Sequence, residues 1–268
     1  MVDQLPNLGR EAEMLATMGM TSMEDLFADI PDEVRMKGPL PLRDPQSEEE
    51  IIADARRLLG SNIALGERPS FLGAGLYRNY VPAAVFQLKT RGEFLTSYTP
   101  YQPEVSQGML QAMWEFQTLI SELVGLPIAN LSLYDGSTAA AEAITCSVRV
   151  HNRKAMQKNT VYVSELTPPD RMSVMENYCQ GAEISIKLLR HNPDGTVNLS
   201  SAQEAAGSCG VYVEQPNPIG VLDGGIPMLK EIVGEHTALI VAVQPISLGL
   251  VEAPGAYGAD IVAVSYTH

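Results

Sequence analysis

The sequence predicts an α/β protein in which a mostly parallel β-sheet, buried on both faces, follows a helical N-terminal segment. Short apolar runs rich in β-branched residues alternate with helical patterns in the second half of the chain, and such runs are typical of strands covered on both faces. The expected strands are Leu131–Tyr134, Thr160–Ser164, Ile184–Leu189, Gly210–Glu214, Ala238–Val243 and Ile261–Val264. The helices expected between them include Ser137–Val150 and Pro169–Cys179.

The region before the sheet is predicted to be helical. We expect residues 1–69 to form an N-terminal arm and residues 70–268 to form the large domain. In the arm, Ser47 and Glu50 have the spacing of a capping box. In this motif the side chain of each residue accepts a hydrogen bond from the backbone N–H of the other residue. This box predicts a helix over Glu48–Leu59.

A longer amphipathic helix is predicted from Glu104 to about Val124, with Gly125 closing it because glycine tolerates the left-handed conformation that ends many helices. Its inner face is expected to carry Leu110, Met113, Trp114, Gln117, Ile120 and Leu123.

Composition excludes several classes of protein. The chain has 268 residues, 45% of them hydrophobic, which is enough for one large domain or one and a half. Its net charge of −14 disfavours nucleic-acid binding, which usually needs clustered basic residues. No apolar run is long enough for a membrane span, and no leader pattern opens the chain. Three scattered cysteines without metal-ligand spacing indicate small buried thiols in a reducing cytoplasm and no metal site.

One loop concentrates polar and aromatic groups. Within Tyr98–Gly108, proline-stiffened backbone presents Tyr98, Tyr101, Gln102 and Glu104 just before the long helix. A rigid loop with such donors and acceptors at a helix start is suited to the wall of a binding pocket. The alternative is a proline-rich turn that only caps the helix.

Two further segments lie where α/β folds place ligands. Asp135-Gly136-Ser137-Thr138-Ala139 joins a short strand candidate to a helix, and backbone N–H groups and hydroxyls in such turns bind phosphate, unless Asp135 or Ser137 is an ordinary helix cap. Glu214–Gly220 follows an apolar strand and brings polar side chains to its carboxyl end, although it could be a plain exit from the strand.

Together these segments resemble the glycine cleavage system P-protein, specifically its N-terminal half, which in many prokaryotes is a separate subunit 1. The resemblance is carried by SFLGAGLYRNYVPAAV, by the long block RGEFLTSYTPYQPEVSQGMLQAMWEFQTLISELVGLPIANLSLYDGSTAAAEA, by VEQPNPIGVLDG and by SLGLVEAPGAYGADIV. It spans nearly the whole chain but roughly the first 60% of such a subunit, so we expect an incomplete copy of a longer protein.

The resemblance implies a pyridoxal-phosphate-dependent transferase-like fold of the aspartate aminotransferase type. It implies a complex with P-protein subunit 2 that decarboxylates glycine on pyridoxal phosphate and passes the aminomethyl group to the lipoyl arm of H-protein. In that setting Tyr98, Tyr101, Gln102 and Glu104 would wall the active site or lipoyl channel. Asp135, Ser137 and Thr138 would occupy the phosphate-loop position of the fold, in a vestigial form if subunit 1 holds no cofactor.

The chain departs from a complete pyridoxal-phosphate enzyme. No lysine lies at a strand end where it could form the Schiff base, and Gln244 stands where a carboxylate would meet the pyridine nitrogen. These departures fit a subunit 1 whose partner supplies the lysine, so that this chain binds no cofactor covalently. Two alternatives stay open: a self-sufficient pyridoxal-phosphate transaminase or desulfurase, and a non-catalytic scaffold subunit.

Overall fold

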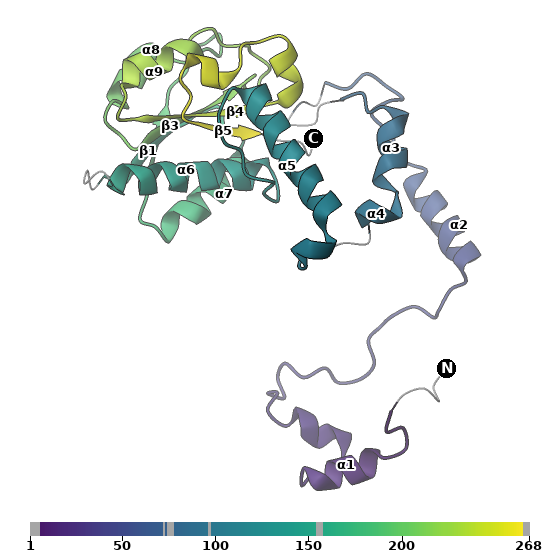
Figure 1. Cartoon of the computed structure of the whole chain (residues 1–268). Helices are drawn as coiled ribbons and strands as arrows, with labels where there is room; N and C mark the ends of the chain where they lie inside the picture. Colours follow the sequence, from purple (N-terminus) through teal and green to yellow (C-terminus); the bar gives the residue numbers. More distant parts are fainter. Residues whose placement is uncertain (1–5, 72, 74–77, 96–97, 154–157, 265–268) are drawn as a thin grey trace. The chain divides into compact units, whose positions relative to one another are not determined.

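The computed structural model describes residues 6–71, 73, 78–95, 98–153 and 158–264 (Figure 1). It divides the chain into two compact units, Met1–Ile63 and Ala64–His268. Most of the glycine-containing segment 70–77, as well as Lys154 and the tail 265–268, lies outside the described residues.

The first unit is made of short helical elements, which are α1 (Glu11–Thr17), η2 (Met23–Phe27) and α2 (Glu48–Leu59). The capping box predicted for α2 is confirmed: Glu50 Oε2 accepts from the Ser47 backbone N–H at 2.8 Å, and Ser47 Oγ accepts from the Glu50 backbone N–H at 3.3 Å. Leu15 is the buried hydrophobic residue of this unit among those described.

The second unit begins with helices that precede the sheet, namely α3 (Ala83–Lys89), α4 (Gly92–Leu95), η3 (Pro103–Val105) and α5 (Gln107–Val124). The predicted start of the long helix at Glu104 is wrong, because a separate 3-10 turn occupies Pro103–Val105 before α5 begins. The predicted end is confirmed, since Gly125 takes the left-handed conformation at φ 72°. Trp114 was expected on the inner face but is 72% exposed.

The core of the second unit is a five-stranded, entirely parallel sheet in the order β2-β1-β3-β4-β5. Its strands are β1 (Thr160–Ser164), β2 (Ser185–Leu189), β3 (Gly210–Gln215), β4 (Ala238–Val243) and β5 (Ile261–Val264). The connecting elements are α6 (Gly136–Arg153), α7 (Pro169–Gln180), α8 (Leu199–Glu204), η4 (Ile226–Met228), α9 (Leu229–Val233), η5 (Pro245–Gly249) and η6 (Pro254–Tyr257). Five of the six expected strands are therefore present, and the expected strand Leu131–Tyr134 is not formed.

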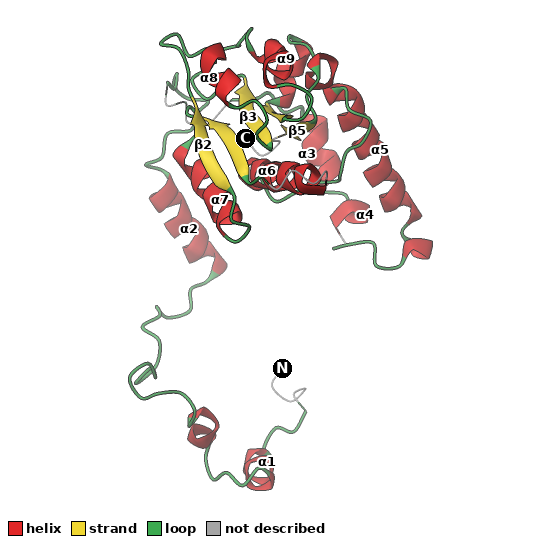
Figure 2. Cartoon of the chain, turned by 90° about the vertical axis from the view of Figure 1, so that its left-hand side faces the viewer, coloured by secondary structure: helices red, strands yellow, loops and turns green. Residues whose placement is uncertain are grey.

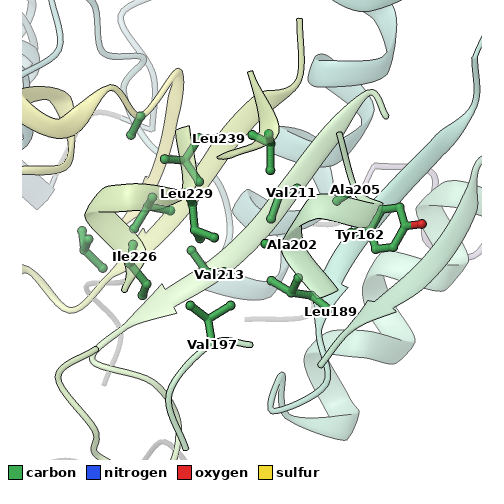
Figure 3. Packing of buried hydrophobic residues seen from close by; sticks show 14 residues of the cluster. Tyr162, Leu189, Val197, Ala202, Ala205, Val211, Val213, Ile226, Leu229 and Leu239 are labelled. Atoms are coloured by element: carbon green, nitrogen blue, oxygen red, sulfur yellow. The ribbon is translucent and has the colours of Figure 1, made fainter. Parts of the chain in front are cut away.

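Helices cover both faces of this sheet, with α6 and α7 on one face and α8 and α9 on the other (Figures 1 and 2). Alternate residues of β3 point to opposite layers: Val211 and Val213 join the cluster with α8 and α9, whereas Tyr212 joins the cluster with α6 and α7. Figure 3 shows the first cluster, in which Leu229 of α9 and Leu239 of β4 lie among the labelled apolar side chains. The two-residue repeat of a strand thus builds two cores.

The end of α5 is fixed against the segment before β5. A Cβ added to Gly255 would lie 1.9 Å from the carbonyl oxygen of Gly125, so only glycine permits this approach of two backbones.

Candidate functional site

The carboxyl edge of the parallel sheet is the place where α/β folds hold ligands. Here the described residues bring together the ends of β1, β3 and β4 and the starts of α6 and α7. The turn before α6 carries Asp135, the first turn of α7 carries Arg171, and the carboxyl end of β3 carries Glu214. These three side chains interact electrostatically, because Arg171 acts on both carboxylates.

A buried ion-pair network lies at this edge. Arg171 Nη1 donates to Glu214 Oε2 at 2.5 Å and to the Tyr212 hydroxyl at 3.4 Å, and that hydroxyl donates to Glu214 Oε1 at 3.1 Å. Tyr212 and Glu214 are two residues apart on β3, so both point toward α7. The network fixes the first turn of α7 to the end of β3.

Burial decides the electrostatics of this network. It raises the pKa of Glu214, an effect that the nearby guanidinium offsets only in part. Burial also disfavours the charge of Arg171, but Tyr212 and Glu214 outweigh it, so the pKa of Arg171 is raised and its charge is permanent. Arg171 Nε is buried and has no hydrogen-bond partner among the described residues.

The sequence reasoning missed Arg171. A usable signal was present, because a glutamate inside a strand buried on both faces must find a cationic partner or lose its charge. The alternation of Tyr212 and Glu214 indicated the face on which that partner had to lie.

The start of α6 has its own anion. Asp135 Oδ1 accepts from the Thr138 backbone N–H at 2.8 Å, and Asp135 Oδ2 accepts from the Thr138 hydroxyl at 3.0 Å. The hydrogen bond from the Thr138 N–H, above all, lowers the pKa of Asp135, and the Ser137 N–H and Arg171 act in the same direction. Asp135 therefore caps the helix, which is the simpler of the two roles that the sequence allows for this turn, a helix cap or a phosphate-binding turn.

The polar side chains at the end of β3 and just after it form hydrogen bonds within their own loop instead of pointing into solvent. Gln215 exchanges two hydrogen bonds with the backbone of Asp223, and Asn217 accepts from the Val221 N–H at 3.0 Å and donates to the Gly195 carbonyl at 2.8 Å. Because both side chains are buried and satisfied, this segment is a structured exit from the strand.

Gln244, which follows β4, is likewise engaged. Its Oε1 accepts from the Ser247 backbone N–H at 3.1 Å, which caps η5, and its Nε2 donates to Asn79 Oδ1 at 3.4 Å. A neutral amide with these partners cannot supply the negative charge that a protonated pyridine nitrogen needs.

The four residues predicted to form a pocket wall are all on the surface. Tyr98 and Tyr101 are 95% and 81% exposed, and Gln102 and Glu104 are exposed as well. Within the described part of the chain, none of these side chains forms a hydrogen bond or an ion pair. Among the described residues, no hydrogen bond or ion pair joins these side chains to the ion-pair network, and their role as a pocket wall stays a prediction.

The described lysines of the sheet region lie away from the carboxyl edge. Lys158 donates to the Gly207 carbonyl before the first residues of β1 and β3, and Lys230 donates to the Thr237 carbonyl just before β4. Lys187 lies within β2 over the Tyr162 ring. A cavity of about 490 Å³ lies beside β2 and α8 and is lined by Lys187, Arg190 and Glu204 among others. None of the predicted site residues lines this cavity.

Comparison with known proteins decides the family. The family model described as "Glycine cleavage system P-protein" matches residues 6–267. A probable glycine dehydrogenase (decarboxylating) subunit 1 of Pyrococcus abyssi is 45% identical over 260 residues, covering 96% of this chain and 57% of that protein. This chain belongs to the glycine cleavage system P-protein family. The chain spans a little over half the length of the curated relatives it matches.

Solved structures confirm the predicted fold class. A crystal structure of a glycine decarboxylase (P-protein) in inhibitor-bound form has a TM-score of 0.76 and 38% identity, covering 95% of this chain and 56% of that one. A sphingosine-1-phosphate lyase of Burkholderia pseudomallei has a TM-score of 0.55 at 14% identity, covering 88% and 56%, and so shares the fold alone. The pyridoxal-phosphate-dependent transferase-like fold is therefore established for this chain.

The residues at the carboxyl edge do not fit a pyridoxal phosphate held by this chain. The described lysines of the sheet region lie elsewhere, the side chain that follows β4 is the neutral amide of Gln244, and the carboxylate of Asp135 already accepts from the Thr138 N–H and hydroxyl. No group of three or more His, Cys, Asp or Glu side chains in the described ranges is placed to hold a metal ion. Among the same residues, no helix is both long and apolar enough to cross a membrane.

Proposed function

We propose that this chain is part of subunit 1 of glycine dehydrogenase (decarboxylating). With subunit 2, it decarboxylates glycine on pyridoxal phosphate and transfers the aminomethyl group to the lipoyl arm of H-protein. The observation that carries the proposal is the family match along residues 6–267, supported by subunit 1 relatives at 45% identity. Because the chain covers 57% of such a relative, the activity belongs to the longer subunit in its complex.

In this proposal the Schiff-base lysine belongs to subunit 2, and this chain binds no cofactor covalently. The lack of a lysine among the described residues at the carboxyl edge supports that division. Bound pyridoxal phosphate supplies the electron sink for the carbanion left by loss of CO₂. We also assign Asp135, Ser137 and Thr138 to the phosphate-loop position of the fold, in a vestigial form.

We assign the pocket wall to Tyr98, Tyr101, Gln102 and Glu104. Their exposure and their lack of partners in the described part of the chain leave two hydroxyls, an amide and a carboxylate available to a partner or substrate. The proline-flanked loop and α5 limit the freedom that these groups would lose on binding. Their task would be to orient the lipoyl arm or glycine and to keep water away from the reacting carbon.

The complex is proposed to act in the cytoplasm. Cys146, Cys179 and Cys209 are free thiols, which suits a reducing compartment, although Cys146 is exposed and not buried as the sequence predicts. Burial raises the pKa of the Cys179 thiol to about 11, so this cysteine is an inert core residue.

The test is a glycine–CO₂ exchange assay on the full-length subunit reconstituted with subunit 2 and H-protein. Tyr101→Phe and Glu104→Gln should each reduce exchange by roughly 5- to 150-fold, the equivalent of about 1–3 kcal/mol for one lost hydrogen bond at the site. Thermal midpoints should stay unchanged, because both side chains are exposed and unpaired among the described residues.

Matched controls are Tyr80→Phe, which alters another exposed loop tyrosine, and Glu122→Gln, which alters an exposed glutamate on α5. Both should leave exchange at the wild-type rate. Wild-type exchange in Tyr101→Phe and Glu104→Gln would remove the pocket-wall assignment and favour the scaffold alternative. Exchange by this subunit without subunit 2 would instead support a self-sufficient enzyme.

A further inference from the structure

The turn before α6 is where this fold meets a cofactor phosphate, because a helix N-terminus presents unpaired backbone N–H groups and the positive end of the helix dipole. In this chain the Thr138 end of that turn already has an acceptor. The Thr138 N–H and the Thr138 hydroxyl donate to the two oxygens of Asp135 at 2.8 and 3.0 Å. A phosphate oxygen would have to displace the carboxylate from both.

The charges around Asp135 also disfavour a phosphate at this turn. Arg171 is the cation that acts on the Asp135 carboxyl, and its Nη1 is already bonded to Glu214 at 2.5 Å. Two carboxylates therefore share one guanidinium at this edge. A phosphate added beside them would bring up to two more negative charges without a described cation to balance them, and like charges a few ångströms apart repel strongly at a protein surface.

Burial prevents the network from rearranging around a phosphate. Glu214 and Tyr212 are buried, and the hydroxyl between them is satisfied by Glu214. If Arg171 turned toward a phosphate, Glu214 would remain buried without its cation, which is costly. The guanidinium is thus committed to the strand and not to a ligand.

We propose that Asp135 is a built-in substitute for the cofactor phosphate, and that it closes this subunit's own phosphate position. The helix keeps an anion at its N-terminus, so the fold is preserved, while the position no longer accepts a ligand. The inference rests on the placement of the phosphate loop in the proposed function, but not on the pocket wall or on turnover. It names Asp135 as the residue that makes this half of the fold cofactor-free.

The test is titration with inorganic phosphate of the full-length subunit in complex with subunit 2, followed by calorimetry. Asp135→Ser keeps a helix-capping acceptor but removes the charge and one oxygen. It should add one phosphate site per copy of this chain, at least roughly tenfold tighter than any background of the wild type, as removal of one neighbouring like charge predicts. The wild-type complex is the baseline, so any site in subunit 2 cancels.

Asp194→Ala is the matched control, because Asp194 Oδ1 also accepts from a threonine N–H and hydroxyl, those of Thr196, but not at the start of a helix. It should gain no phosphate site.

Asp135→Gly is the second variant, since glycine at an N-cap costs the helix little. Circular dichroism verifies that Asp135→Ser and Asp135→Gly are both folded. Equal phosphate binding by the wild type and by Asp135→Ser would overturn the proposal. So would a folded Asp135→Ser and Asp135→Gly that bind none. Neither result depends on glycine exchange, so failure here is distinguishable from failure of the proposed function.

Discussion

Replacing Arg171 by methionine should destabilise this protein strongly. The substitution keeps much of the length of the side chain but leaves Glu214 without its cation in a site where the two side chains are 21% and 10% exposed. Removing one partner of a buried pair costs about 3–5 kcal/mol, and the partial exposure of Arg171 places this case near 3 kcal/mol. For a domain of this size, that corresponds to a fall in the thermal midpoint of roughly 6–12 °C.

The loss should depend on pH, because Glu214 is left as a buried acid. Burial raises its folded pKa above the ordinary value, so protonation of the variant relieves the unpaired charge. An acid with a raised folded pKa favours the folded state at pH below its unfolded pKa, and this contribution disappears as the pH rises through the folded pKa. The penalty of Arg171→Met should therefore be largest at neutral pH and should shrink as the pH falls through the raised folded pKa toward the ordinary 4.5 of a glutamate.

Arg190→Met is the matched control. Arg190 pairs with Glu165 at 2.8 Å, but its side chain is 65% exposed, so its loss should cost less than about 1 kcal/mol. Thermal unfolding of the full-length subunit, followed by circular dichroism at two pH values, measures both variants. Equal shifts for Arg171→Met and Arg190→Met, or a loss for Arg171→Met that does not change with pH, would refute the reasoning.

Two further predictions follow from backbone packing and from the helix cap. Gly255→Ala should lower the free energy of unfolding by more than about 2 kcal/mol, because the added Cβ would meet the Gly125 carbonyl oxygen at 1.9 Å, whereas Gly249→Ala, with nothing within 4 Å, should change it by less than about 0.5 kcal/mol. Chemical denaturation distinguishes them, and equal effects would contradict the close approach. Asp135→Asn should cost about 0.5 kcal/mol at neutral pH, a small value because the carboxylate is exposed to solvent. Since the folded pKa of Asp135 is lowered below the ordinary 3.8, this difference should be full above that pH and vanish as the pH falls through the folded value; a constant difference down to about pH 2 would contradict it.

The sheet could be predicted from sequence because each of its strands carries a local signal. β3 is buried along its whole length, and its residues Val211 to Val213 are large and apolar, which a strand covered on both faces requires. Leu131–Tyr134 carries a similar apolar run but forms no strand, and Leu131, Leu133 and Tyr134 are exposed. A strand exists only when a neighbour supplies hydrogen bonds, and four residues do not reveal that neighbour.

The candidate site was less accessible to sequence reasoning. Asp135 and Thr138 could be predicted because a short, hydroxyl-bearing turn before a helix is a local pattern, which suits either a phosphate site or a helix cap. Arg171 and Glu214 are separated by 43 residues, and they meet only because β1 and β3 are adjacent in the parallel sheet. The same limit applies to the contact between Gly125 and Gly255, which depends on the path of the chain between α5 and η6.

Borohydride trapping tests most directly the central claim that this chain belongs to the half of the complex that holds no covalent cofactor. The full-length subunit and subunit 2, assembled with pyridoxal phosphate, would be reduced, digested and mapped by mass spectrometry. The account predicts a phosphopyridoxyl group on a lysine of subunit 2 and none on this chain, together with loss of the aldimine absorption band near ~420 nm that belongs to the bound cofactor. A phosphopyridoxyl lysine in this chain would contradict the account.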